Sequence, residues 1–160
     1  MKIRKLLALS ALALAAVAPL AAPAQQAVRV GSKNFTDQFV LAEIYAQALE
    51  AAGIKTEKKL NLGGTLIAQK AMEEKQIDFY PEYTGTMLLA VLKQEPMTDA
   101  KAVYDKVKEG YAKMGFVVLN RVSALLDETT MAQMNYQVDG DKLEPKDVAR
   151  DFLKAKGLVK

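Results

Sequence analysis

The chain has 160 residues, with 22 lysine and arginine side chains against 19 aspartate and glutamate side chains. It contains no cysteine and no histidine, which excludes disulfides, zinc or copper sites built on thiolate or imidazole, and nucleophilic triads that need either residue. Carboxylates, lysine, arginine, tyrosine, serine and threonine remain to carry chemistry, and we expect neither a metal site nor a cofactor.

Residues 1–24 have the pattern of a secretory signal peptide. Three basic residues lie among the first five, and an apolar run follows from Leu6 to Leu20. That run is shorter than the roughly 20 apolar residues that span a bilayer, and the small residues before Gln25 suit cleavage after Ala24. No cysteine follows the run, which favours a free protein over a lipoprotein. We therefore expect export to the periplasm.

Cleavage would leave residues 25–160, enough for one ordinary domain. It would also take three of the 22 basic side chains, so 19 would remain against 19 acidic ones. The basic character of the whole chain is then a targeting feature, and we expect no nucleic acid partner.

Strands and helices alternate over residues 28–119, which predicts an α/β fold with a mixed, mostly parallel sheet and helices on both faces. We expect strands at 27–31, 54–62, 77–80 and 116–119, the last one buried because it is almost fully apolar. The expected helices run from a cap at Asn34 or Thr36 to about 52, over 66–75 and 87–92, and from 97–99 to Gly115.

Two loops in this alternation precede helices and are candidate anion sites. Lys33 follows the first strand, where a helix N-terminus attracts anions and the lysine adds a full charge. Gly63-Gly64-Thr65 precedes the second helix, and such a turn can cradle an anion. An ordinary solvated lysine and a tight connecting turn explain the same residues equally well.

The rest of the chain is organised around one segment, Asp78-Phe79-Tyr80-Pro81-Glu82-Tyr83-Thr84-Gly85-Thr86. Pro81 ends a strand because it has no N–H to donate, and Thr84 or Thr86 can cap the next helix. Ligands bind at such strand ends in open α/β sheets. Tyr80 and Tyr83 would there offer π faces to a cation, or else pack as a buried strand end.

After Leu119 the alternation stops and a C-terminal helical return over 127–157 is predicted. Asp127 caps a helix over 128–137, and Pro145 opens a helix over 145–156 that Gly157 ends.

Three motifs, in order, resemble the glycine betaine/carnitine/choline-binding proteins of ABC importers. They are Val28-Arg29-Val30-Gly31-Ser32-Lys33-Asn34-Phe35-Thr36, Asn61-Leu62-Gly63-Gly64-Thr65 and Tyr80-Pro81-Glu82-Tyr83-Thr84-Gly85-Thr86. Two stretches of the tail, 135–139 and 148–153, are similar as well. Family members have two lobes, and here the strand ending at Leu119 leads almost at once, by Leu126, into the C-terminal return. The resemblance therefore implies a single lobe of a type II periplasmic binding protein, with the second lobe missing.

The resemblance also implies a ligand site, since the family holds a quaternary ammonium group among aromatic rings and a carboxylate with basic and hydroxyl groups. Tyr83 matches a wall of that cage, and Lys33 and Thr86 match contacts to the carboxylate. Asn34, Thr65 and Tyr80 complete the candidate set.

Three functions remain open from the sequence. The first is the periplasmic solute-binding component of an ABC importer for quaternary-ammonium osmoprotectants, truncated to one lobe and weak in binding, with an inner-membrane permease as partner. The second is an interaction or remnant lobe that docks on a permease, a partner chain or itself without trapping solute. The third and least favoured function is that of an enzyme. Asp78 and Glu82 could act as a pair of carboxylates, but no further catalytic residues in the sequence support them.

Overall fold

The computed structural model describes residues 26–119 and 125–160. The predicted signal peptide lies outside the described residues, as does most of the junction between Leu119 and Leu126. In chain order the elements are β1 (Val28–Gly31), α1 (Thr36–Ala51), β2 (Thr56–Lys59), α2 (Thr65–Glu73), α3 (Thr84–Thr86), η1 (Met87–Val91), α4 (Ala100–Lys113), α5 (Glu128–Asp139) and α6 (Pro145–Ala155).

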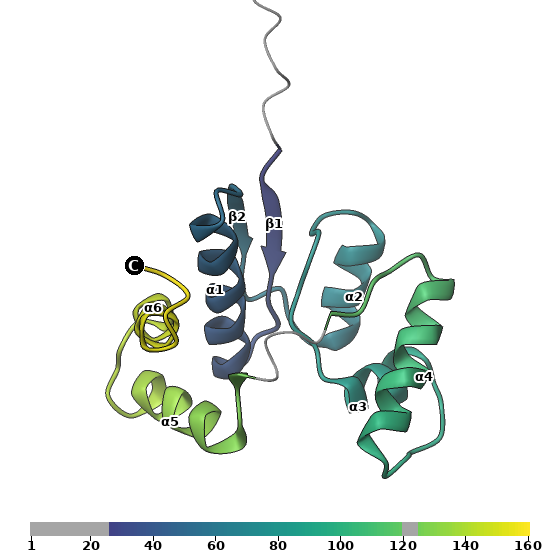
Figure 1. Ribbon diagram of the computed structural model, residues 1–160. Helices are drawn as coiled ribbons and strands as arrows, with labels where there is room; N and C mark the ends of the chain where they lie inside the picture. The colour runs from purple at the N-terminus through teal and green to yellow at the C-terminus, as the bar shows by residue number, and fades with distance from the viewer. Residues whose placement is uncertain (1–25, 120–124) are drawn as a thin grey trace, which may run out of the picture.

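The sheet is parallel, as predicted, but smaller. β1 and β2 pair in parallel from Val28 opposite Thr56 to Gly31 opposite Lys59. The expected strand at 77–80 is reduced to one parallel bridge between Val30 and Phe79. In Figure 1, α1 lies on one side of this small sheet and α2 on the other, so the predicted coverage of both faces is confirmed.

The expected buried strand at 116–119 is wrong. The segment has no strand pairing, and Val117 is 82% exposed. Phe116 and Val118 instead pack against the apolar cluster formed by η1 and α4. Alternate side chains of an extended segment point to opposite sides. Here α4 and η1 cover the side that carries Phe116 and Val118, so that side is packed without a neighbouring strand.

One predicted helix cap is wrong, one is right in position, and the predicted cap Asp127 is confirmed. The N-cap of α1 is Phe35, where Asn34 or Thr36 was expected. The helix expected from Met87 has Thr86, one of the two expected residues, at its N-cap, but without a side-chain cap bond. Asp99 accepts a hydrogen bond from the Ala102 N–H, and Asp127 accepts one from the Thr130 N–H. Carboxylates at N-caps satisfy N–H groups that have no partner in the helix.

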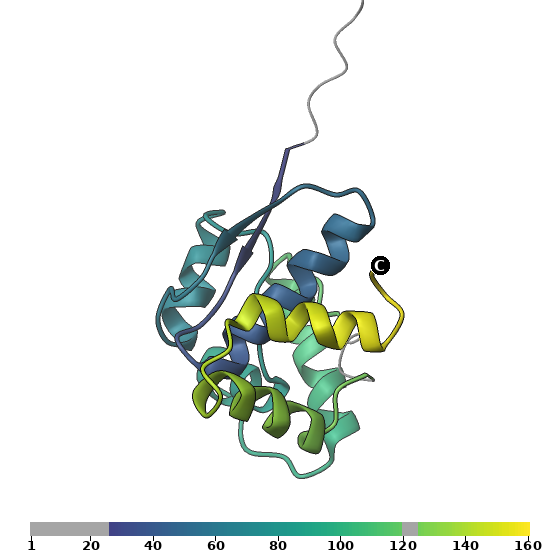
Figure 2. The same cartoon turned by 90° about the vertical axis from the view of Figure 1, so that its left-hand side faces the viewer.

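The two ends of the described chain share one apolar core. α6 packs across α1, and α5 contacts both helices, as Figure 2 shows from the side where α5 and α6 face the viewer. Val40 and Ile44 of α1 meet Met134 of α5 and Phe152 and Leu153 of α6 in one cluster. The C-terminal helices α5 and α6 therefore pack onto α1 of the N-terminal part. Within the described residues, no helix is long and apolar enough to cross a membrane.

Candidate functional site

The loop after β1 joins the two other motif loops through backbone hydrogen bonds. The Asn34 N–H donates to the Gly63 carbonyl at 3.1 Å, and the Leu62 N–H donates to the Ser32 carbonyl at 3.0 Å. The Gly31 N–H donates to the Phe79 carbonyl at 2.7 Å. The three sequence motifs therefore meet at one end of the sheet, as the parallel order of their strands requires.

Lys33 and Glu82 form a buried ion pair at the centre of these loops. The Lys33 Nζ donates to the Glu82 Oε1, and the two side chains are only 3% and 2% exposed. The backbone N–H of Tyr83 donates to the same oxygen at 2.8 Å. Sequence analysis grouped Glu82 with Asp78, but the structure separates them, because Asp78 pairs with Arg29.

Two aromatic rings lie beside the Lys33 ammonium group. Its Nζ is 5.0 Å from the Tyr83 ring centroid and 5.8 Å from that of Phe35. Both distances are within the range of cation–π attraction. Tyr83 is nevertheless 46% exposed, and Phe35 is exposed to a similar extent, so these rings accept a protein cation and still present surface to solvent.

The hydroxyl of Tyr83 is held by the first turn of α1, where it donates to the Asp37 carboxylate. Burial, followed by the hydrogen bond to Asp37, raises the pKa of Tyr83 to about 12. The phenol is therefore neutral at physiological pH, and Tyr83 contributes its ring rather than a charge.

Tyr80 is buried and does not share the exposed surface of Tyr83, so the alternative of a buried strand end applies to Tyr80. Its hydroxyl donates to Gln69 Oε1 at 3.0 Å, and the Tyr111 hydroxyl donates to the same oxygen at 3.1 Å. Burial raises the pKa of both tyrosines, that of Tyr111 to about 12. Tyr80 is thus anchored to α2 and α4.

The remaining predicted residues lie around these loops and, within the described chain, form no hydrogen bond with the Lys33 side chain. Asn34 is exposed, Thr65 begins α2, and Thr86 ends α3. The structure therefore brings Lys33 and Tyr83 together with Phe35, which was not among the predicted solute-binding residues. The solute-binding roles of Lys33, Tyr83, Thr86, Asn34, Thr65 and Tyr80 stay predictions.

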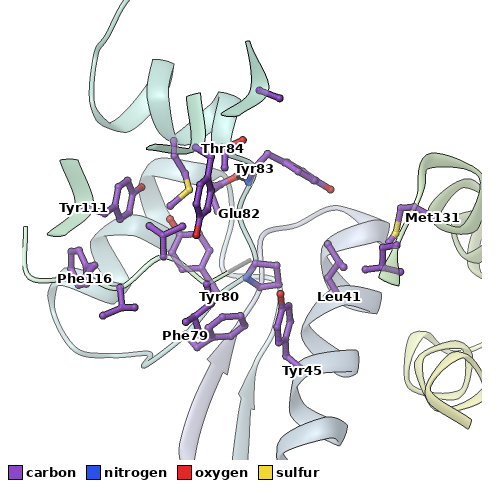
Figure 3. A pocket seen from close by; sticks show the side chains of 18 of the residues that line it. Leu41, Tyr45, Phe79, Tyr80, Glu82, Tyr83, Thr84, Tyr111, Phe116 and Met131 are labelled. Carbon is purple, nitrogen blue, oxygen red and sulfur yellow. Dashed lines mark hydrogen bonds between the residues drawn. The ribbon is translucent and has the colours of Figure 1, made fainter. Parts of the chain in front are cut away.

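A cavity of about 720 Å³ adjoins the 79–84 segment, between α1 and α5 on one side and η1 and α4 on the other. Figure 3 shows its aromatic walls, with Tyr45 and Phe79 at one end and Tyr111 and Phe116 at another. The ring centroids of Tyr45 and Phe79 lie 4.5 Å apart, with the two ring planes tilted by 57°. Sequence analysis missed these walls because they come from four separate elements, and only the run around Tyr80 gave a local signal.

Among residues 26–119 and 125–160, no group of three acidic side chains is placed to hold a metal ion. The candidate site thus consists of an ion pair, aromatic rings and a cavity, an arrangement that can bind organic solutes.

Residues 26–118 and 116–155 match the family described as OpuAC, the substrate binding domain of ABC-type glycine betaine transport system. The chain is 37% identical over 94 residues to a glycine-betaine-binding protein of Pseudomonas aeruginosa, covering 59% of this chain and 30% of that protein. It is also 37% identical over 111 residues to the glycine betaine-binding protein YehZ of Escherichia coli, covering 68% of this chain and 36% of YehZ. The chain thus matches about a third of the length of these curated relatives.

The fold is similar to that of apo YehZ from Escherichia coli, with a TM-score of 0.69 at 18% identity. That superposition covers 83% of this chain and 99% of the solved chain. The likeness supports the predicted α/β fold of a single lobe. Because the family match spans both the N-terminal part and the C-terminal helices, the chain belongs to the OpuAC family of substrate binding domains of glycine betaine transport systems.

Proposed function

We propose that this chain is the solute-binding component of an ABC importer for quaternary-ammonium osmoprotectants, acting in the periplasm as a single lobe beside an inner-membrane permease. The observation that carries the proposal is the placement of the Phe35 and Tyr83 rings around a cation where the three motif loops meet. The family membership and the relatives named for glycine betaine support the same solute class.

The chemistry of the solute explains why rings matter here. A trimethylammonium group carries a positive charge but has no N–H to donate, so an aromatic face recognises it better than a hydrogen-bond acceptor does. Tyr83 is 46% exposed and presents ring surface beyond the part that faces Lys33. We therefore assign Tyr83 the main contact with the solute cation.

Lys33 contributes less than its sequence position implies. Its ammonium group already donates to Glu82 in a buried pair, so a solute carboxylate reaches it only in exchange for that partner. Thr86 and Asn34 lie nearer to solvent and are left to meet the carboxylate as hydrogen-bond donors.

Weak binding follows from one open lobe. A ring–cation contact at an exposed site contributes about 0.5–1 kcal/mol, and an exposed ion pair adds about 0–1 kcal/mol. Together these contributions stay below the roughly 4 kcal/mol of a millimolar dissociation constant. We expect glycine betaine, choline and carnitine to bind at millimolar strength or weaker.

An NMR titration with these three solutes tests the proposal. The wild-type chain should show saturable shifts, and Tyr83→Ala should abolish them. Tyr136→Ala is the matched control, because Tyr136 is an exposed tyrosine on α5 and its removal should leave the titration unchanged. Micromolar binding by the monomer, or full binding by Tyr83→Ala, would contradict the proposed site.

A docking lobe that does not trap solute is the second candidate. Phe35 and Tyr83 are exposed, and so are Leu66 and Ile67 in the first turn of α2, next to the glycine loop that Asn34 contacts. Exposed apolar patches mark association surfaces. Light scattering at high concentration should reveal self-association in this case, and a strict monomer that binds osmolytes would favour the first candidate.

A further inference from the structure

The charges around the Phe35 and Tyr83 rings are not balanced. Lys33, whose ammonium group lies beside both rings, already pairs with Glu82, and the two side chains are 3% and 2% exposed. Because these opposite charges are buried and joined by a hydrogen bond, together they present no net charge to a solute. A preference of the site for one charge class of solute then depends on the other charged side chains near the rings.

Asp37, in the first turn of α1, supplies such a charge. Its carboxylate accepts a hydrogen bond from the Tyr83 hydroxyl and a longer one, of 3.3 Å, from the Gln38 side-chain amide. Both donors are neutral, and within residues 26–119 and 125–160 Asp37 forms no salt bridge. The N-terminus of α1 offsets about half an elementary charge, so a net negative charge remains at the hydroxyl end of the Tyr83 ring.

The two further charged residues described at this end of α1 offset each other. The Thr36 hydroxyl donates to Asp139 Oδ1 at 2.9 Å, and the Lys142 ammonium group donates to the Asp139 backbone carbonyl at 2.6 Å. One acidic and one basic side chain thus lie close together around the C-terminal end of α5. Asp37 remains as the unbalanced charge beside Tyr83.

Two kinds of trimethylammonium solute respond differently to this charge. Choline carries only a positive charge, so Asp37 attracts it to the exposed part of the Tyr83 ring. Glycine betaine carries a carboxylate close to its cation, and repulsion between that carboxylate and Asp37 offsets much of the attraction. In return the solute carboxylate meets the neutral donors Asn34 and Thr86, because Glu82 already occupies Lys33.

We propose that Asp37 is a specificity-determining residue, which makes the site favour trimethylammonium solutes without a carboxylate, such as choline, over zwitterionic ones such as glycine betaine. The inference rests on the proposed function, since it concerns the same rings, and it adds the charge class of the preferred solute. Attraction between opposite charges at an exposed site changes an affinity by about two- to fivefold, and we expect a preference of that size.

The amide of glycine betaine isolates the effect of charge, because it has nearly the shape of glycine betaine but no negative charge. NMR titrations of the full chain with choline, the amide and glycine betaine give three dissociation constants. Choline and the amide should bind about two- to fivefold more tightly than glycine betaine, and added salt should reduce the difference. The ratio of these constants is the readout, because partial unfolding of a variant scales all three equally.

Two variants separate the charge of Asp37 from its hydrogen bond. Asp37→Asn removes the charge and keeps an oxygen that accepts from the Tyr83 hydroxyl, so the three solutes should then bind about equally. Tyr83→Phe removes the hydrogen bond and keeps both the ring and the charge, so the preference for choline should persist.

Asp147→Asn is the matched control, because it removes the same charge from the first turn of α6. The neighbouring Lys146 carbonyl accepts from Gln47, which lies about 15 Å along α1 from Asp37 at the helical rise per residue. Charges this far apart are largely screened at physiological salt, so Asp147→Asn should leave the ratio unchanged.

Glycine betaine that binds as tightly as its amide would overturn the inference, as would an Asp37→Asn variant that keeps the wild-type preference. In both cases the proposed function stands, because quaternary-ammonium solutes still bind. Absence of binding by all three solutes would instead overturn the proposed function, and the preference with it.

Discussion

Two ion pairs connect β1 and the loop after it to the 78–82 segment, and they differ in burial. Arg29 pairs with Asp78, and Lys33 pairs with Glu82, each across 49 residues of sequence. The equal separations follow from the parallel register, in which Val30 lies opposite Phe79. The Arg29 and Asp78 side chains are 23% and 41% exposed, whereas those of Lys33 and Glu82 are 3% and 2% exposed.

The difference shows that register places charges together but burial sets their energy. The exposed pair is geometrically better, since Arg29 Nε and Nη2 donate to separate Asp78 oxygens at 2.9 and 2.6 Å. An exposed pair still contributes only about 0–1 kcal/mol. Removing one member of a buried pair costs about 3–5 kcal/mol, because the other charge is left unsolvated.

The largest expected effect is that of Glu82→Ala. It leaves the Lys33 ammonium buried without its carboxylate, and we expect the free energy of unfolding to fall by about 3–5 kcal/mol. Urea denaturation followed by circular dichroism measures the loss. A loss below 1 kcal/mol would show that Lys33 reaches solvent easily and that the two pairs are equivalent.

The double variant Lys33→Met/Glu82→Leu is the control for this result. An apolar pair of similar volume avoids the buried charge, and such replacements are often neutral or stabilising. We expect the double variant to be more stable than Glu82→Ala. A double variant as unstable as the single one would point to lost packing rather than to an unpaired charge.

Gly31→Ala tests the backbone between the two pairs. An added Cβ would lie 2.6 Å from Ile77 Cδ1 and 3.1 Å from Leu62 Cδ1. Overpacking of this kind costs about 1–3 kcal/mol, and urea denaturation should show a loss in that range. Gly64→Ala is the matched control, because a Cβ there meets nothing within 4 Å. Equal effects of the two substitutions would contradict the close packing at Gly31.

Arg29→Ala should have a smaller effect, a loss of about 0.2–1 kcal/mol that shrinks as salt is added. Arg29→Lys keeps the charge but loses the two-pronged hydrogen bonding, so it should fall between the wild type and the alanine variant. A loss that is large and insensitive to salt would mean that Arg29 acts through packing of its stem.

The smallest expected effect is the loss, at low pH, of the stability that the Arg29–Asp78 pair contributes. The hydrogen bond from Arg29 lowers the pKa of Asp78 below its ordinary value of 3.8. The stability that the charged carboxylate contributes is therefore present above pH 3.8 and is lost as the pH falls through the lower, folded-state pKa. We expect the difference in stability between wild type and Arg29→Ala to shrink below pH 3.8 and to vanish below the folded-state pKa of Asp78. A difference that persists there in urea melts would show that the ion pair is not its source.

Much of the fold is determined by local sequence. Asp99 and Asp127 cap their helices because their carboxylates accept from N–H groups three residues on. Pro145 opens α6, and the apolar spacing of Val148, Phe152 and Leu153 buries them against α1. The motifs also determined that the three loops would meet, because parallel strands bring their carboxyl ends to one edge.

Tertiary structure decided the rest, where the outcome depends on residues distant in sequence. The apolar run 116–119 predicts a buried strand, but α4 and η1 cover one of its sides and Val117 is exposed. Tyr80 and Tyr83 look equivalent in sequence, yet Gln69 on α2 anchors one and Asp37 on α1 holds the other. Lys33 reads as a free loop lysine, and only the register that sets Glu82 beside it determines that it is buried. Spacing along the chain determines local geometry, whereas burial depends on which elements pack over a side chain.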